Sequence, residues 1–145
     1  MILLVLLKEL IVEIRWIQRF ENFRSANSNL LETQYCIKKE GLNKIYIMAL
    51  IQAYEMSFEL AWKTLKDYLE YYGKIVENPR SAIKEAFSEK LIQDGQIWIE
   101  MMEARNKTSH TYREDFAKQT AENILNLYIP QLKNLEKVLE IKTNE

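Results

Sequence analysis

The sequence predicts an all-α protein, an antiparallel four-helix bundle built from three long helices and two short ones. Apolar residues recur every three or four positions along most of the chain, which is the spacing of a buried helix face. No segment alternates apolar and polar residues with the period of two that marks a strand. The 145 residues include only three Gly and two Pro, so few positions interrupt a helix. We expect residues 1–145 to form a single domain with its own core.

The first predicted helix runs from the N-terminus to Gly41, which breaks it. Its apolar stripe consists of Leu10, Ile14, Ile17, Phe20, Phe23, Leu30 and Ile37. The helix opens with Met1 to Leu7, seven consecutive apolar residues closed by Lys8, whereas a membrane span needs about 20. We therefore expect no membrane contact. These first turns should pack on the protein's own core or on a second protomer.

The second predicted helix has the most regular apolar stripe, and Gly73 ends it. The stripe consists of Ile47, Leu50, Ile51, Tyr54, Phe58, Ala61, Trp62, Leu65, Leu69 and Tyr72. The large side chains that we assign to core packing are Phe58, Trp62 and Met101. Glu55, Glu59 and Lys63 follow one another at four-residue spacing on a solvated flank, where Glu59 and Lys63 can form an intrahelical ion pair.

Two short helices are predicted next, and together they form one arm of the bundle. The pair Asn78-Pro79 offers a side-chain N-cap followed by proline at the first helical position, which opens the first of them. Asp94-Gly95 starts the second, and this helix should fray near Ser109.

The last predicted helix follows a capping box, Thr111-x-x-Glu114, in which the two side chains satisfy free backbone N–H groups at the helix start. Its apolar stripe consists of Phe116, Ala121, Ile124, Tyr128, Leu132, Leu135 and Leu139. Pro130 lies inside this helix and should kink it, because proline has no backbone N–H.

The composition excludes several functional classes. With 20 Lys and Arg against 21 Asp and Glu, the chain lacks the basic excess of a dedicated duplex-DNA binder. One Cys, Cys36, and one His, His110, cannot form an intrachain disulfide or a zinc site of the Cys/His type. The residue three positions before His110 is Lys107, so the Glu-x-x-His motif of di-iron bundles is absent. We expect a cytoplasmic protein with no metal and no cofactor.

The segment Arg105–Tyr112 is the candidate functional site, at the junction of the fourth and last predicted helices. This segment and the next residue supply three cations and no acid, namely Arg105, Lys107 and Arg113. Arginine can hold a phosphate through two parallel hydrogen bonds, and histidine can carry protons near neutral pH. We therefore predict that these cations bind phosphate beside His110. In the alternative interpretation, Arg105 pairs with an acid or caps carbonyl groups, and His110 only closes the turn.

Four short motifs resemble one known family. They are Tyr54–Lys63 (Tyr-Glu-Met-Ser-Phe-Glu-Leu-Ala-Trp-Lys), Asn78–Arg80, Asp94-Gly95 and Arg105–Tyr112. Through them the stretch from Ile45 to Leu135 is similar to the nucleotidyltransferase substrate-binding family, a branch of the HEPN superfamily. The resemblance implies a HEPN-like four-helix bundle that forms a homodimer and pairs with a minimal nucleotidyltransferase encoded nearby. The run from Met1 to Leu7 is more apolar than the family requires.

The resemblance also implies roles for individual residues. Many HEPN proteins are toxins that cleave RNA without metal, and their signature is an arginine, a polar residue and a histidine after a short spacer. Arg105, Asn106 and His110 occupy those three positions, with Arg105 as the phosphate clamp and His110 as the proton carrier. In related two-component modules the partner adds AMP to a tyrosine two residues after the histidine, and Tyr112 stands at that position.

The resemblance leaves two functions open. In the first, the chain is the HEPN component of a two-gene toxin–antitoxin module and cleaves RNA at a composite site formed by two protomers. The partner nucleotidyltransferase then regulates it through Tyr112. In the second, the chain is a non-enzymatic subunit that binds a nucleotide or another substrate for that nucleotidyltransferase. Both functions use the same residues. A free-standing structural bundle is a third class.

Overall fold

The computed structural model describes residues 1–108 and 113–145, and within these ranges the chain is helical and contains no strand. The helices are α1 (Ile2–Glu40), α2 (Lys44–Tyr71), α3 (Pro79–Ser88), α4 (Gly95–Thr108), α5 (Glu114–Asn123), the π-helical turn η1 (Ile124–Tyr128) and α6 (Ile129–Thr143). The prediction of an all-α protein is confirmed.

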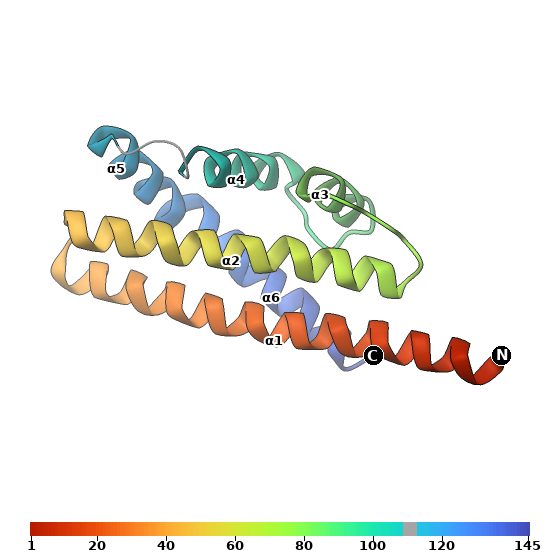
Figure 1. The fold of residues 1–145 in the computed structure, drawn as a ribbon. Coiled ribbons are helices and arrows are strands. Elements are labelled where there is room, and N and C mark those ends of the chain that lie inside the picture. Colours follow the sequence, from red (N-terminus) through yellow and green to blue (C-terminus); the bar gives the residue numbers. More distant parts are fainter. Residues whose placement is uncertain (109–112) are drawn as a thin grey trace.

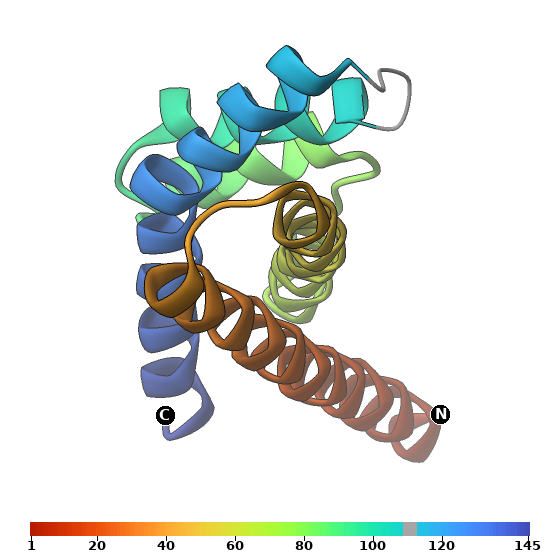
Figure 2. The same ribbon diagram turned by 90° about the vertical axis from the view of Figure 1, so that its left-hand side faces the viewer.

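The helices form four arms that alternate in direction (Figure 1). α1 and α2 lie side by side and run in opposite directions, α3 and α4 follow one another along a third arm, and α5, η1 and α6 return as the fourth. Figure 2, turned by 90°, shows α2 between α1 and the arm of α3 and α4. This arrangement is the predicted antiparallel four-helix bundle, with the two short helices sharing one arm.

Local sequence signals fix most helix ends. Gly73 follows α2 with φ of 83°, a backbone conformation that favours glycine. The Asn78 side chain accepts a 2.8 Å hydrogen bond from the backbone N–H of Ser81 at the start of α3. Asp94 accepts one of 3.1 Å from the N–H of Ile97 at the start of α4. The three predicted boundaries are confirmed, because each depends on residues only a few positions apart.

The predicted capping box does not open α5. This helix begins at Glu114, its N-cap residue is Arg113, and the Arg113 side chain makes no capping hydrogen bond. Thr111 lies outside the described residues. The acidic residues Glu114 and Asp115 occupy the first turn instead, where negative charge is favoured by the helix dipole.

The predicted kink at Pro130 takes the form of the π-helical turn. η1 ends at Tyr128, and Pro130 is the second residue of α6. A proline ring crowds the carbonyl group four residues before it and offers no N–H to bond it. The wider turn of a π-helix relieves this crowding while the chain stays helical.

The core is rich in aromatic side chains from several arms. The fully buried large residues are Phe20, Phe23, Leu30, Leu50, Tyr54, Phe58, Leu65, Leu69, Ile83, Trp98, Met101 and Ile124. Phe58 and Met101 are buried as predicted, and Trp62 is half-buried against the same cluster. Trp16 is also buried although the predicted stripe missed it, and it packs edge-on against Tyr68 with ring centroids 5.0 Å apart.

The N-terminal part of α1 extends past the rest of the bundle. α1 has 39 residues and α2 has 28, and the start of α1 projects past the end of α2 (Figure 1). The residues from Met1 to Leu7 are between 46% and 101% exposed, and Leu10 and Ile14 are exposed as well. Of the two predicted packings of these first turns, on the protein's own core or on a second protomer, the structure overturns the first. In the described residues no helix is both long and apolar enough to cross a membrane.

Candidate functional site

A groove with a volume of about 830 Å³ lies between α2, the end of α4 and the start of α5. Its apolar lining consists of Ile47, Met48, Ile51, Met56 and Ala117. Its polar lining consists of Lys44, Gln52, Glu55, Glu59, Arg105, Thr108, Glu114 and Lys118. Arg105, the central residue of the candidate site, therefore faces a hollow large enough for a small ligand.

Arg105 forms an ion pair inside this groove. Its Nη1 atom lies 3.2 Å from Oε2 of Glu55 on α2, and the two side chains are 29% and 26% exposed. The Nε atom of Arg105 is buried and has no hydrogen-bond partner among the described residues. The interpretation that Arg105 pairs with an acid is confirmed. That pair lies in the groove, so the guanidinium group is still placed where a ligand can reach it.

Tyr54 positions the turn of α4 that precedes Arg105. Its hydroxyl group donates a 2.7 Å hydrogen bond to the carbonyl oxygen of Met101, and its ring stacks on Tyr128 at 5.5 Å. Burial raises the pKa of Tyr54 well above its ordinary value, while the charge of Arg105 acts in the opposite direction. The hydroxyl therefore remains a hydrogen-bond donor and holds α4 against α2.

The other predicted phosphate-binding cations, Lys107 and Arg113, are not among the described residues that line the groove. Lys107 is exposed, and Arg113 is exposed and pairs with Asp115 at 3.1 Å. Asn106 is also exposed, next to Arg105 on α4.

His110 and Tyr112 lie outside the described residues. Their place in the chain is still informative, because both belong to the four residues that connect α4 to Arg113. Thr108 before this connection and Glu114 just after it both line the groove. These two lining residues lie two positions before His110 and two positions after Tyr112 in the sequence.

Among the described residues, the charges that line the groove are balanced. Its cations are Lys44, Arg105 and Lys118, and its acids are Glu55, Glu59 and Glu114. Lys44 lies 3.5 Å from Glu114, which links the start of α2 to the start of α5. Glu59 pairs with Lys63 at 3.3 Å, as predicted from their spacing.

Sequence reasoning missed two of these cations and the partner of Arg105. Lys44 and Lys118 belong to helices other than α4, and their positions in the sequence do not indicate that they lie near Arg105. Glu55 was assigned to a solvated flank, because the four-residue spacing to Glu59 describes only one helix. No signal in the sequence pairs Glu55 with a residue 50 positions away.

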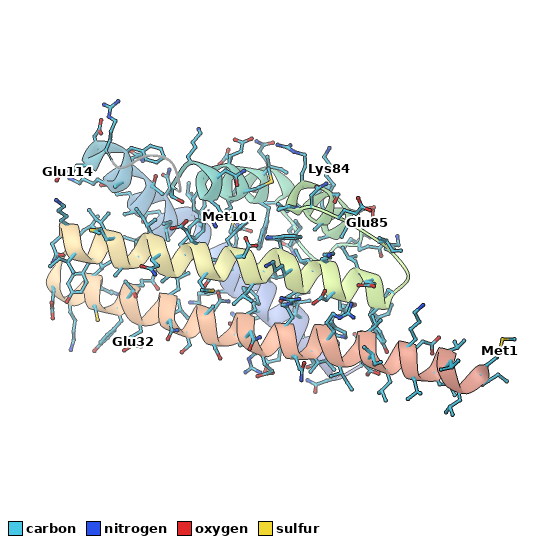
Figure 3. The ribbon with its side chains drawn as sticks, viewed as in Figure 1. Met1, Glu32, Lys84, Glu85, Met101 and Glu114 are labelled. Carbon is cyan, nitrogen blue, oxygen red and sulfur yellow. The ribbon has the colours of Figure 1, made fainter. Side chains whose placement is uncertain are left out.

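The groove and the exposed start of α1 lie at opposite ends of the bundle. Figure 3 labels Met1 at one end and Glu114, which lines the groove, at the other. A contact made by the first turns of α1 is therefore separate from a contact made at the groove. Within the described residues, no group of three His, Cys, Asp or Glu side chains could hold a metal ion.

Comparisons with known proteins agree with this architecture. The family model described as nucleotidyltransferase substrate binding protein like matches residues 18–141, which includes most of the first helix as well as the motifs noted above. No curated protein matches the chain.

Three solved structures are similar to this chain. A protein from Thermus thermophilus is 28% identical to this chain, with a TM-score of 0.65. The match covers 79% of this chain and 96% of the Thermus thermophilus chain. A Haemophilus influenzae protein, described as having the fold of a substrate binding domain of a nucleotidyltransferase, is 23% identical with a TM-score of 0.74, covering 83% and 98%. The tri-AMPylated HEPN toxin of Shewanella oneidensis, in complex with MNT antitoxin, is 11% identical with a TM-score of 0.70, covering 87% and 96%.

Proposed function

The chain belongs to the family described as nucleotidyltransferase substrate binding protein like, and on this premise we propose that it is the HEPN component of a module with a minimal nucleotidyltransferase. Its proposed activity is metal-independent cleavage of RNA. The observation that supports this proposal is the position of Arg105, half-buried in a groove next to the segment that contains His110. The Shewanella oneidensis neighbour, a HEPN toxin bound to MNT antitoxin, supports the choice of partner.

The proposed reaction needs two kinds of group. RNA carries its own nucleophile, the 2′-hydroxyl, so cleavage requires a group that moves protons and a cation that stabilises charge on the phosphate. His110 is the proton carrier and Arg105 is the phosphate clamp. Asn106, beside Arg105, completes the signature, while Lys107 and Arg113 supply further positive charge on the exposed side where an RNA strand would pass.

A homodimer would complete this site. A single Arg105 and His110 pair offers one proton carrier, whereas acid and base steps need two. The exposed apolar residues Ile45, Met48 and Met56 stand at or beside the groove, and they are 77%, 63% and 57% exposed. A second copy packed on this face would cover them and bring a second Arg105 and His110 pair to the same place. A second copy packed on the start of α1, at the other end of the bundle, would not bring its Arg105 to this groove (Figure 3).

The partner nucleotidyltransferase is proposed to regulate this site at Tyr112. AMP added to this tyrosine would place a negative phosphate and a bulky nucleoside two residues from His110. The modification would therefore compete with RNA for Arg105.

Cleavage of RNA in EDTA tests the proposal. Purified protein is expected to cut single-stranded RNA and to spare DNA, which lacks the 2′-hydroxyl. His110→Ala should reduce the rate by about 10²–10⁴, the usual contribution of one acid–base group. Arg105→Lys should recover little of the activity lost in Arg105→Ala, because an ammonium group cannot form the two parallel bonds. Lys84→Ala, an exposed change on α3, serves as the control.

A second function is supported by the balanced charge of the groove. In the described part of the groove three acids face three cations, and Arg105 already has a carboxylate partner. This arrangement suits selective binding of a small nucleotide better than attraction of a long polyanion. Under this alternative the chain is a non-enzymatic subunit that binds a nucleotide for its partner. Wild-type protein that leaves RNA intact but binds AMP in an Arg105-dependent manner would favour it. A cleavage rate that His110→Ala does not change would contradict the first proposal.

A further inference from the structure

We propose that Glu55 is an internal competitor for the phosphate site, so that a nucleotide phosphate binds both Nη atoms of Arg105 by displacing the Glu55 carboxylate. This inference rests on the proposed role of Arg105 as an anion clamp and adds a residue that sets the affinity of that clamp. Glu55 belongs to α2, 50 positions before Arg105, and the two side chains meet in the wall of the groove.

The donors of Arg105 explain why the two anions compete. A guanidinium group holds a phosphate in a bidentate manner either through Nε and one Nη atom or through both Nη atoms. Nε is buried and has no partner in the described part of the chain, so the first mode is closed to a ligand in the groove. The second mode needs Nη1, and Nη1 is the atom that Glu55 engages at 3.2 Å. A phosphate bound to both Nη atoms would place a second anion beside Nη1, where it repels the Glu55 carboxylate and competes with it for the same guanidinium edge.

The ion pair is suited to this exchange. Both side chains are more than a quarter exposed, so water can solvate the carboxylate after it leaves Arg105. A pair of this kind is weak enough for an incoming ligand to displace. It also neutralises Arg105 in the unbound protein, which prevents an uncompensated cation in a half-buried position.

The groove offers a matched control in Glu59. This residue lines the same groove one helical turn after Glu55 and carries the same charge. Its ion-pair partner is Lys63, at 3.3 Å, and not Arg105. Glu59→Gln therefore removes one negative charge from the groove without freeing Nη1, whereas Glu55→Gln does both.

Titration calorimetry with AMP as the probe tests the inference. Glu55→Gln should bind AMP about fivefold more tightly than wild type, the effect of losing one weak competing pair. Glu59→Gln should change the affinity less than about twofold, because distant exposed charges are screened. The double variant Glu55→Gln/Arg105→Ala should bind AMP no more tightly than Arg105→Ala, because the guanidinium group for which Glu55 and phosphate compete is absent.

The possible outcomes separate this inference from the proposed function. AMP binding that needs Arg105 but is equal or weaker in Glu55→Gln than in Glu59→Gln overturns the competitor role and leaves the anion site intact. Absence of AMP binding in wild type and in Glu55→Gln overturns the anion site itself. Should Glu55→Gln lose its helical circular-dichroism signal, the inference is tested by NMR on the wild-type protein. On AMP addition the ¹³C resonance of the Glu55 carboxylate must then shift more than that of Glu59, and an unchanged Glu55 resonance contradicts the inference.

Discussion

The Tyr54 hydroxyl lies 2.7 Å from the carbonyl oxygen of Met101, and this buried contact joins the middle of α2 to α4 one turn before Arg105. Arg105 and Glu55 extend from the same two stretches of helix, since Glu55 follows Tyr54 directly. The hydrogen bond therefore sets the distance between the two helices at the place where their charged side chains pair.

Loss of this hydrogen bond should destabilise the bundle. Tyr54→Phe is expected to lower the free energy of unfolding by about 1 kcal/mol, the usual net value of one buried hydrogen bond. Urea unfolding followed by circular dichroism measures the change. Tyr46→Phe is the control, because the Tyr46 hydroxyl bonds to Glu40 on the surface and its loss should cost less than about 0.5 kcal/mol. Equal losses in both variants would contradict the structural role of Tyr54.

The protein should lose stability in alkali. Burial raises the pKa of Tyr54, Tyr68 and Tyr128 above the ordinary 10.0. Below that pH these tyrosines are neutral in both the folded and the unfolded chain. Above about pH 10 the tyrosines ionise first in the unfolded chain, and this ionisation stabilises the unfolded state. The free energy of unfolding therefore falls as the pH rises.

Comparison of urea unfolding at about pH 8 and about pH 11 checks this dependence. Tyr54→Phe should reduce the loss of stability between these two pH values by about 1 kcal/mol, because one buried tyrosine no longer ionises on unfolding. Tyr35→Phe removes an exposed tyrosine and should leave the loss unchanged. A loss that is the same in wild type and in Tyr54→Phe would contradict the prediction.

The homodimer should form through the groove face. Light scattering at micromolar concentration is expected to give twice the mass of one chain. Met48→Glu places a charge on the exposed apolar residues beside the groove and should shift the mass to that of a monomer. Leu4→Glu places the same charge on the exposed start of α1 and should leave the dimer intact. A monomeric wild-type protein, or the reverse response of the two variants, would remove the composite site.

Tyr112 should accept AMP from the partner enzyme. After incubation with a minimal nucleotidyltransferase, Mg²⁺ and ATP, intact-mass spectrometry should show the addition of AMP, and RNA cleavage should fall. Tyr112→Phe should abolish the mass gain at this site. Tyr72→Phe, an exposed tyrosine after α2, should not affect it. An unchanged gain in Tyr112→Phe would place the modification elsewhere.

Local residue patterns are enough to predict the helices and most of their ends. Gly73, Asn78 and Asp94 stop or start helices through contacts within four residues, so their effect can be derived from neighbouring positions in the chain. The stripe of α2 likewise predicted that Phe58 is buried, because a helix with one apolar face must cover it. The family resemblance and the choice of Arg105 were also available from the sequence.

Which side chains meet depends on how distant helices pack, and local patterns do not contain this information. Trp16 is buried against Tyr68 of α2 and Leu10 is 50% exposed, although both lie on apolar parts of α1, because side chains of the neighbouring helix cover the two positions to different extents. Arg105 pairs with Glu55 on another helix, and the acids Glu59 and Glu114 from other parts of the chain line the same groove. Helical periodicity reports which residues share a face, while the charge and exposure of that face depend on contacts between distant segments.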